Sequence, residues 1–217
     1  MLGDELTDVL QLTARGNELI ILGQEILHTL EQLCAYMLSI AALDPSTVPF
    51  QRRPVALSEL AERTATHFQS SAQVKGIAIR LQLPTSIAVP LIEGDPTLLE
   101  HLLSNLVGNS IKHTPSGGSV TLCLIPEGGV VHLEVTDTGI GMGTENIQAA
   151  LSGSGRPSGQ PTAGEDSTGT GLSVIWHIVK AHRAHLAIFS EGRGKGTTFR
   201  ITFPAVKDIP SIPVSQQ

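Results

Sequence analysis

The sequence predicts an α/β (α+β) two-layer sandwich, in which one mixed sheet is covered by about three helices, preceded by a helical, hairpin-like segment. Two observations carry this prediction. Stretches in which apolar and polar residues alternate, typical of half-buried strands, are interleaved with stretches at three- and four-residue apolar spacing, typical of helices. The chain has 217 residues, of which 41% are hydrophobic and 16% charged, so it can bury a substantial core. Interleaved strands and helices favour a single sheet with helices packed on it.

The first part of the chain has an apolar pattern of its own. Leucine, isoleucine, valine and methionine recur at helical spacing over residues 4–43, and Gly16-Asn17 predicts a turn between a short helix and a longer one. Such a segment can bury its apolar stripe against itself or a second copy, so we expect a homodimer formed through residues 4–43. The predicted division is a helical segment (1–43), a Pro-rich linker (44–54), the sandwich (55–204) and an unstructured tail (205–217).

Each element of the sandwich is predicted by its own periodicity. The last two strands are expected to form a hairpin. Residues 152–169 have almost no apolar side chain, and a loop of this length in a compact domain predicts an active-site lid. The expected helices are 58–73, 95–112 and 170–182, and the expected strands are 77–83, 120–124, 131–135, 186–188 and 199–203.

Composition excludes several classes of function. The chain carries 14 Lys plus Arg against 20 Asp plus Glu, a net charge of −6, and no basic run, which argues against nucleic acid or an anionic membrane as partner. No stretch approaches the roughly 18 apolar residues of a membrane span, and the start lacks the basic region of a signal peptide. Cys34 and Cys123 are expected to be reduced structural thiols. We therefore expect a cytoplasmic protein without a membrane segment.

A polar stripe on the predicted helix 95–112 is the first candidate site. Asn105 and Asn109 are four residues apart and share one helix face, with Lys112 one turn further on. An asparagine oxygen can bind Mg²⁺ without adding charge, and a lysine can neutralise a phosphate. The alternative is an amphipathic helix whose polar face is merely solvated.

Two glycine-containing segments are the other candidates. Asp137 ends a predicted strand and is followed by Gly139 and Gly141, so a ligand N–H group could bind the carboxylate while the ligand lies against bare backbone. Residues 167–173 place Gly169 and Gly171 at the start of a helix, where N–H groups and the helix dipole favour phosphate. A strand-to-turn junction and an ordinary helix cap are the alternatives.

Taken together and in this order, these motifs resemble the ATP-binding domain of the histidine kinase, gyrase, Hsp90 and MutL superfamily, and within it the two-component sensor histidine kinases. Asn105 to Pro115 is similar to the N box, Asp137 to Met142 to the first glycine box, and Gly169 to Leu172 to the second. Residues 194–199 are similar to the last hairpin. The resemblance covers about residues 54–204 and implies a Bergerat-type ATP-binding fold, with ATP and Mg²⁺ as cofactors.

The resemblance also implies roles for individual residues. Asn109 binds Mg²⁺, Lys112 contacts phosphate, and Asp137 accepts a hydrogen bond from the adenine amino group. His113 either approaches the nucleotide or is an ordinary helix-end histidine. The full cofactor-binding set that the resemblance implies is Asn105, Asn109, Lys112, His113, Asp137, Gly139, Gly141, Met142, Thr168, Gly169, Thr170, Gly171, Leu172 and Thr197.

Asn105 separates the branches of this superfamily. Gyrase, MutL and related ATPases carry a glutamate at this position, where a carboxylate can accept a proton from the attacking water. An amide cannot, so Asn105 favours a site that holds ATP for transfer to another acceptor. Asn105 and Lys112 are the predicted catalytic residues. The implied reaction moves the γ-phosphoryl group to a protein histidine, and then to the receiver domain of a response regulator.

The phosphoacceptor motif of sensor kinases is not matched. None of the eight histidines has the expected neighbours, and residues 4–10 echo the motif only faintly, with Asp4 in place of the histidine. His28 is the best internal candidate because it lies on a predicted helix. The chain could therefore be a piece of a kinase or act in trans, or it could be a non-catalytic nucleotide-binding signalling module; an anti-sigma-type serine/threonine kinase is a third hypothesis. Residues 143–167 also lack the aromatic residue of the family's lid.

Overall fold

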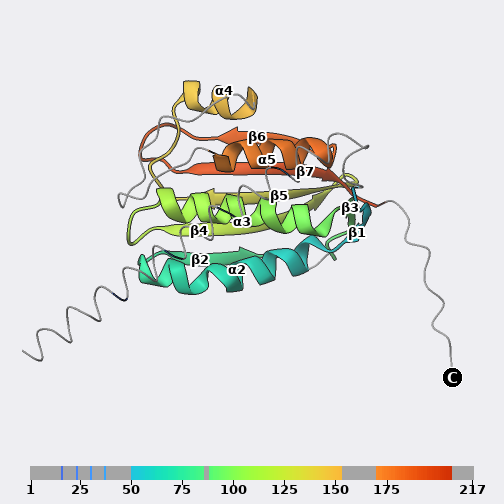
Figure 1. The fold of residues 1–217 in the computed structure, drawn as a ribbon, viewed down its shortest axis with the longest axis horizontal. Coiled ribbons are helices and arrows are strands. Elements are labelled where there is room, and N and C mark those ends of the chain that lie inside the picture. The colour runs from blue at the N-terminus through green and yellow to red at the C-terminus, as the bar shows by residue number, and fades with distance from the viewer. Residues whose placement is uncertain are drawn as a thin grey trace, which may run out of the picture.

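The computed structural model describes residues 50–85, 88–152 and 170–206, together with Gly16, Gly23, Leu30 and Met37. The continuous parts form one five-stranded sheet, a small two-stranded sheet and four helices (Figure 1). The helices are α2 (Leu57–Val74), α3 (Pro96–His113), α4 (Thr144–Ser152) and α5 (Thr170–Ala181). The strands are β1 (Arg53–Val55), β2 (Ala78–Gln82), β3 (Ile92–Gly94), β4 (Ser119–Glu127), β5 (Val130–Asp137), β6 (His185–Phe189) and β7 (Thr197–Pro204).

The five-stranded sheet is mixed, as the sequence predicts. Its strand order is β2-β4-β5-β7-β6, with β2 and β4 parallel and the other neighbours antiparallel. The predicted final hairpin is confirmed by the pairing of β6 with β7. Because β5 pairs with β7 along its whole length, the end of β5 at Asp137 lies opposite the start of β7 at Thr197.

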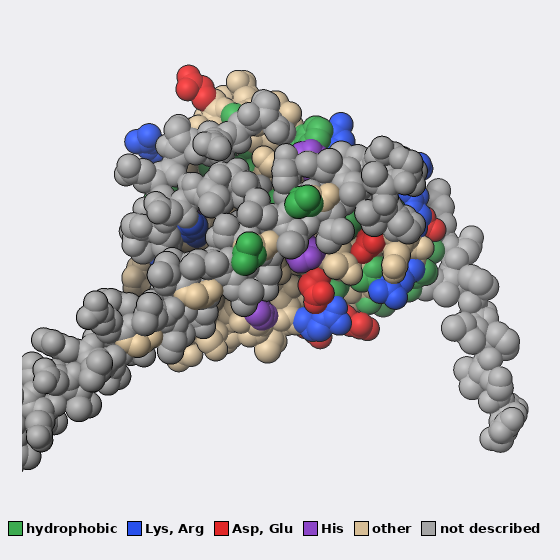
Figure 2. All heavy atoms as spheres, viewed as in Figure 1, with side chains coloured by type: hydrophobic (Ala, Val, Ile, Leu, Met, Phe, Trp, Pro, Cys, Tyr) green, Lys and Arg blue, Asp and Glu red, His purple; other side chains and the backbone are tan. Residues whose placement is uncertain are grey.

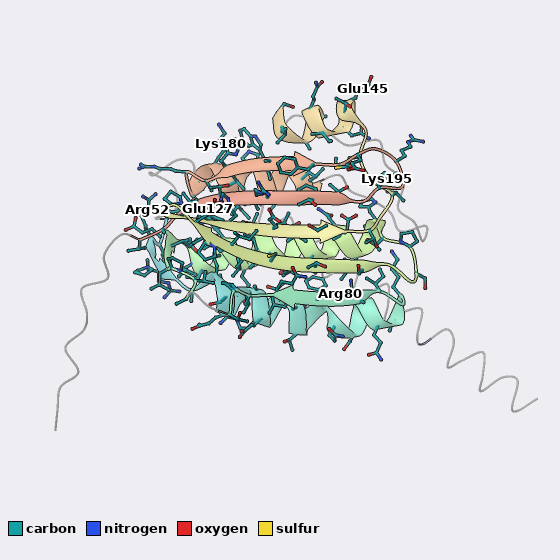
Figure 3. All side chains as sticks on the ribbon, turned by 180° about the vertical axis from the view of Figure 1, so that it is seen from behind. Arg52, Arg80, Glu127, Glu145, Lys180 and Lys195 are labelled. Atoms are coloured by element: carbon teal, nitrogen blue, oxygen red, sulfur yellow. The ribbon has the colours of Figure 1, made fainter. Side chains whose placement is uncertain are left out.

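Helices α2, α3 and α5 cover one face of this sheet (Figure 1). Seen from behind, the strands face the viewer (Figure 3). Burial alternates along β4, β5 and β7, because successive side chains of a strand point to opposite faces. The core therefore lies between the sheet and the three helices, and it is mainly aliphatic. Its largest fully buried side chains include Leu57, Leu99, Leu102, Leu106, Ile175, Ile178, Ile201 and Phe203.

Helix α3 is fixed at both ends by specific groups. Asp95 caps its start, since the carboxylate accepts from the backbone N–H groups of Thr97 and Leu98, and Pro96 supplies a preset helical φ. At the other end the Lys75 ammonium donates to the carbonyl oxygens of Ile111 and Lys112 at 3.0 and 2.8 Å. A cation there satisfies carbonyls that have no partner within the helix.

Three elements were not expected from the sequence. Strands β1 and β3 have three residues each and pair with one another, and β1 begins at Arg53, two residues before the predicted start of the sandwich. Helix α4 precedes the predicted lid and buries only Ala150. Most of residues 1–49, with His28 and the faint motif at residues 4–10, lies outside the described residues, as do residues 153–169 and the tail from 207. Gly16 is helical, so the turn predicted at Gly16-Asn17 is wrong at that residue.

Acidic and basic side chains stand side by side on the helix-covered face (Figure 2). One such pair, Arg63 and Glu100, joins α2 to α3 at 3.6 Å. Both side chains are more than half exposed, so the pair adds little to stability. Within the described part of the chain, no helix combines the length and apolar character needed to span a membrane.

Candidate functional site

The candidate residues from the sequence meet in two places beside the last turns of α3. The first, which we call the Asp137 corner, consists of Asp137, Gly139, Gly141, Ser190, Gly196 and Thr197. The second, which we call the helix junction, consists of Asn105 and Asn109 on α3 and Gly171 on α5. The N–H of Ile140, which follows Gly139, donates to the carbonyl oxygen of His113 at the end of α3 at 3.0 Å, so α3 links the two places.

Backbone N–H groups hold Asp137 in the corner. Its Oδ1 atom accepts from the N–H of Gly139 at 2.8 Å and from the N–H of Thr197 at 3.2 Å. Neither bond uses Oδ2, so the second carboxylate oxygen is the one suited to a ligand donor. A pre-oriented carboxylate at the edge of a sheet can recognise an amino group such as that of adenine.

The glycines of the corner allow main chain to pack directly on main chain. A Cβ atom at Gly139 would overlap the His113 carbonyl oxygen, and one at Gly196 would overlap the carbonyl oxygen of Asp137. Gly196 also has a φ of 70°, in the left-handed region that favours glycine. Main-chain bonds from Ile140 to His113 (3.0 Å) and from Gly196 to Gly139 (3.1 Å) close these contacts. These close contacts of the corner are therefore made by the main chain.

Burial raises the pKa of Asp137 above its usual range. The backbone bonds from Gly139 and Thr197 oppose this shift, and the Ser110 hydroxyl opposes it as well. The residue as a whole is only 6% exposed. Its burial is unfavourable for folding, which is typical of a polar group kept for binding.

At the helix junction, the start of α5 lies against the two asparagines. A Cβ atom placed on Gly171 would stand 3.0 Å from Asn109 Nδ2 and 3.3 Å from Asn105 Oδ1. The sequence predicts both side chains on one face of α3, and both indeed border Gly171. The alternative of a merely solvated polar face does not hold for Asn105, because this residue is buried at 2% exposure. Helix α5 covers it.

Asn105 has an unsatisfied acceptor. Its Nδ2 group donates to the His101 carbonyl at 2.8 Å, while Oδ1 is buried without a hydrogen-bond partner. An unpaired buried acceptor is unfavourable by about 1–3 kcal/mol, and in a native site it indicates a missing ligand donor, ion or water. Beside it, the first turn of α5 supplies N–H groups and the positive end of a helix dipole. The donor set suits a magnesium-bound polyphosphate.

The remaining predicted residues lie around these two places. Lys112 and His113 are half-buried on the last turn of α3, and Met142, also half-buried, packs against the core. Leu172 packs against the core as well. Thr168 and Gly169 lie outside the described residues, and Thr170 is described only as the first residue of α5.

Sequence reasoning missed Ser190, which joins three parts of the corner. Its hydroxyl donates to the Gly196 carbonyl at 2.7 Å and accepts from the Met142 N–H at 3.0 Å. The residue follows β6 in a turn rich in glycine, which is the only signal that could have indicated it. It holds the segment after Gly141 to the β6–β7 turn.

Comparisons with known proteins concern the family and the fold of the chain. Residues 94–207 match the family described as "Histidine kinase-, DNA gyrase B-, and HSP90-like ATPase". The circadian input-output histidine kinase CikA of Synechococcus elongatus is 31% identical over 89% of this chain and 26% of its own, so the chain spans about a quarter of that relative.

Two solved structures share the fold. The catalytic domain of the histidine kinase ThkA has a TM-score of 0.58 at 21% identity and covers 71% of this chain and 96% of its own. Full-length ShkA, solved in complex with AMPPNP, has a TM-score of 0.62 at 22% identity and covers 81% of this chain and 37% of its own. At these identities the likeness concerns the fold alone.

Proposed function

The chain belongs to the family of histidine kinase-, DNA gyrase B- and HSP90-like ATPases, and we propose that it binds Mg·ATP and transfers the γ-phosphoryl group to a protein histidine in a two-component pathway. Its relative CikA carries the name of a histidine kinase, which supports this choice within the family. The matched family alone would equally suit a water-activating ATPase, so the choice rests on the site.

The observation that carries the proposal is the meeting of Asn105, Asn109 and Gly171 beside the Asp137 corner. The two asparagines, Gly171 and Asp137 come from three separate motifs of the sequence, and the fold brings them together along the second half of α3. Asp137, an acceptor for an amino group, and the start of α5, which can bind phosphate, then lie on either side of the last turns of α3. This arrangement fits a nucleotide whose base binds at the corner and whose phosphates reach α5.

In this proposal each residue has one task. Asp137 accepts from the adenine amino group, while Gly139 and Gly141 let the base lie against main chain, with Met142 and Thr197 beside it. Lys112, and His113 if it reaches the nucleotide, contact phosphate, as do residues 168–172. Asn109 is the protein ligand of Mg²⁺, which would neutralise phosphate charge. Phosphoryl transfer depends mainly on such positioning and charge neutralisation.

Asn105 decides between transfer and hydrolysis. Its side chain is an amide, which cannot accept a proton from water, and it is buried beside Gly171. With no base at this position, the site holds the phosphates without activating a water. ATP then persists until a histidine acceptor arrives, and a response-regulator receiver domain is the proposed final acceptor.

The acceptor histidine is proposed to lie on another protein of the pathway, to which this chain transfers the phosphoryl group in trans. The chain is also proposed to form a homodimer through residues 4–43. Leu30 and Met37 are both helical, lie seven residues apart, and are 53% and 71% exposed in the single chain. Apolar residues at heptad spacing favour burial against a partner helix. ATP supply places the proposed reaction in the cytoplasm.

The proposal can be tested with radiolabelled nucleotide. The purified chain is incubated with Mg·[γ-³²P]ATP, alone and with an isolated helical hairpin that carries an intact phosphoacceptor histidine. We expect acid-labile, alkali-stable label on the hairpin, and loss of at least about 100-fold in rate for Asn109→Ala, in line with loss of a metal ligand. Gln73→Ala, which removes an exposed amide from α2, is the matched control and should keep the wild-type rate.

Three other results would contradict the proposal. Bound ATP without label on any protein identifies the non-catalytic module. Acid-stable label identifies a serine/threonine kinase, and rapid phosphate release without a protein acceptor identifies an ATPase.

A further inference from the structure

A buried histidine lies at the other end of α3 and α5 from the helix junction, and both of its ring nitrogens form hydrogen bonds. His182, directly after α5, is 5% exposed. Its Nδ1 lies 2.8 Å from the carbonyl oxygen of Ile178, which can only accept, so Nδ1 carries a proton. Its Nε2 lies 3.0 Å from the backbone nitrogen of Asp95, which donates, so Nε2 carries none. The geometry therefore requires the neutral imidazole with its proton on Nδ1.

Asp95 joins three segments at this point. Its carboxylate caps α3 through the N–H groups of Thr97 and Leu98 and also accepts from the N–H of Gln51 in the segment before β1, at 3.1 Å. Its own N–H is the one that binds His182. We call His182, Asp95 and Gln51 the His182 node. It ties the start of α3 to the end of α5 and to the segment before β1.

Phenylalanine rings and a glycine enclose the imidazole. Phe50 meets it edge to face at 4.9 Å and Phe203 of β7 does so at 6.3 Å. A Cβ atom on Gly94 would stand 2.8 Å from the ring. The ring has little room to turn, so its two hydrogen bonds are fixed in direction.

The node and the helix junction lie at opposite ends of the same pair of helices. Helices α3 and α5 pack against each other, with Asp95 facing His182 at one end and Asn105 and Asn109 facing Gly171 at the other. The helices are thus antiparallel, and about ten residues, or about 15 Å, separate the two contacts. Figure 3 shows the ends apart, with Arg52 at one end of the sheet and Lys195 at the other. A shift of α5 along α3 at the node displaces Gly171 from the asparagines.

We propose that His182 is a positioning residue for the nucleotide site: its neutral ring holds α5 in register with α3 through the Asp95 N–H, and protonation of the ring weakens nucleotide binding from the far end. This inference rests on the function proposed above. The N–H of Gln51 binds the Asp95 carboxylate, so the segment before β1 is in direct contact with the His182 node.

Protonation breaks the node for a simple reason. A proton on Nε2 would face the Asp95 N–H, so two donors would meet. The charged groups that face the ring are Asp95 at the start of α3 and Arg52 from the segment before β1, which is itself paired with Glu93 at 3.9 Å. Burial lowers the pKa of His182 below its ordinary value of about 6.5, and Arg52 adds to this; Ile178 and Asp95 oppose it.

The direction of the pH effect follows from this shift. Above about pH 6.5 the ring is neutral in the folded and unfolded chains, so the node is intact. As the pH falls below this value, the unfolded chain takes up a proton more readily than the folded one, and stability from the node is lost until the folded pKa is passed. In the folded chain the node is complete at neutral pH, and it breaks only when the pH falls through the folded pKa, which burial places below the ordinary value.

The test compares variants of the full chain over pH 5.0–7.5, with binding of Mg·ATP measured by calorimetry. The wild-type Kd should rise by about fivefold more than that of His182→Gln on acidification, which corresponds to one hydrogen bond. Glutamine can accept from the Asp95 N–H and does not titrate, so at pH 7.5 its Kd should stay within about twofold of wild type. His67→Gln, on an exposed stretch of α2, is the matched control and should keep the wild-type profile.

His182→Phe fills the space but has no ring nitrogen. We expect this variant to bind Mg·ATP about fivefold more weakly than wild type at pH 7.5. Its Kd should not show the additional rise on acidification that wild type shows. Asp137 titrates equally in all these variants, so its effect cancels when profiles are compared. A His182→Gln profile that follows wild type, or His182→Phe with wild-type affinity at pH 7.5, would overturn the inference.

A second measurement tests the coupling between His182 and the helix junction in the absence of nucleotide. In ¹⁵N NMR spectra, His182 should show a protonated Nδ1 at pH 7.5, and its titration should shift the side-chain amide signals of Asn105 and Asn109 and the backbone amide of Gly171. Signals that stay fixed while His182 titrates overturn it. Failure of Mg·ATP to bind at any pH contradicts the proposed function, and the NMR titration then still tests the coupling between the two ends.

Discussion

The Asp137 corner and the helix junction differ in what holds them. The corner is held mainly by main-chain bonds around the ends of β5 and β7, with the Ser190 hydroxyl added, and even its carboxylate is held by two backbone N–H groups. The junction is made by side chains of one helix against the first turn of another, and it contains a buried acceptor without a partner. The corner is therefore complete in the single chain, whereas the junction depends on helix register and on what binds there. Changes at the corner should affect folding and affinity, and changes at the junction mainly turnover.

The largest effect is expected from Gly196→Ala at the corner. A Cβ atom there overlaps the Asp137 carbonyl oxygen, which is main chain and cannot move aside, and the φ of 70° adds strain. We expect about 3–5 kcal/mol of lost unfolding free energy in urea denaturation, with no measurable ATP binding. Gly194→Ala is the matched control, since Gly194 has a similar φ of 77° but open space around it. It should lose only about 1 kcal/mol; equal losses in the two variants would show that strain alone matters.

Asp137→Asn separates affinity from stability within the corner. The amide oxygen can keep both backbone bonds, while the amide NH₂ cannot accept from adenine, so we expect the Kd for ATP to rise at least about tenfold. Melting temperature should rise, because burial raises the pKa of Asp137 and the buried charge opposes folding at neutral pH.

The sign of the pH effect can be checked in the same variant. The folded carboxyl takes up a proton at a higher pH than the unfolded one, so acidification relieves the wild-type penalty. The difference in melting temperature between Asp137→Asn and wild type should therefore be largest near neutral pH and shrink as the pH falls through the folded pKa. A variant that binds ATP normally would remove Asp137 from the proposed base site.

Asn105→Leu tests whether the junction serves function rather than folding. Leucine has a similar volume and removes the unpaired Oδ1, so the unfolding free energy should change by less than about 1 kcal/mol. Phosphoryl transfer should fall by about 100-fold, because a polar group beside the phosphates is lost. Gln148→Leu on α4 is the control for the same exchange of an amide at an exposed position. Marked unfolding of Asn105→Leu would instead show that the amide is structural.

This contrast also explains how far the sequence could predict the molecule. Residues in α3 or β5 repeat at a helical or strand period because long elements bury one face, so the main elements were predicted within a few residues. Strands β1 and β3 have three residues each and form only because they pair across nearly forty residues. Asn105 was predicted as a site residue, but its burial could not be predicted, since nothing local shows that α5 covers it. His182 and Asp95 are separated by 87 residues, so their bond leaves no local pattern.

The smallest effect is expected where the two regions are connected. Helix α4 follows the corner and lies beside α5, and the Trp176 indole donates to the Leu151 carbonyl in its last turn at 3.1 Å. Trp176→Phe keeps a ring but removes this bond, which stabilises by about 1 kcal/mol. Hydrogen exchange of the α4 amides should then be about fivefold faster, while the Gly139 and Thr197 amides, which Asp137 binds, keep their protection. If the corner amides also lose protection, α4 supports the corner as well, and the corner is less independent than its main-chain bonds indicate.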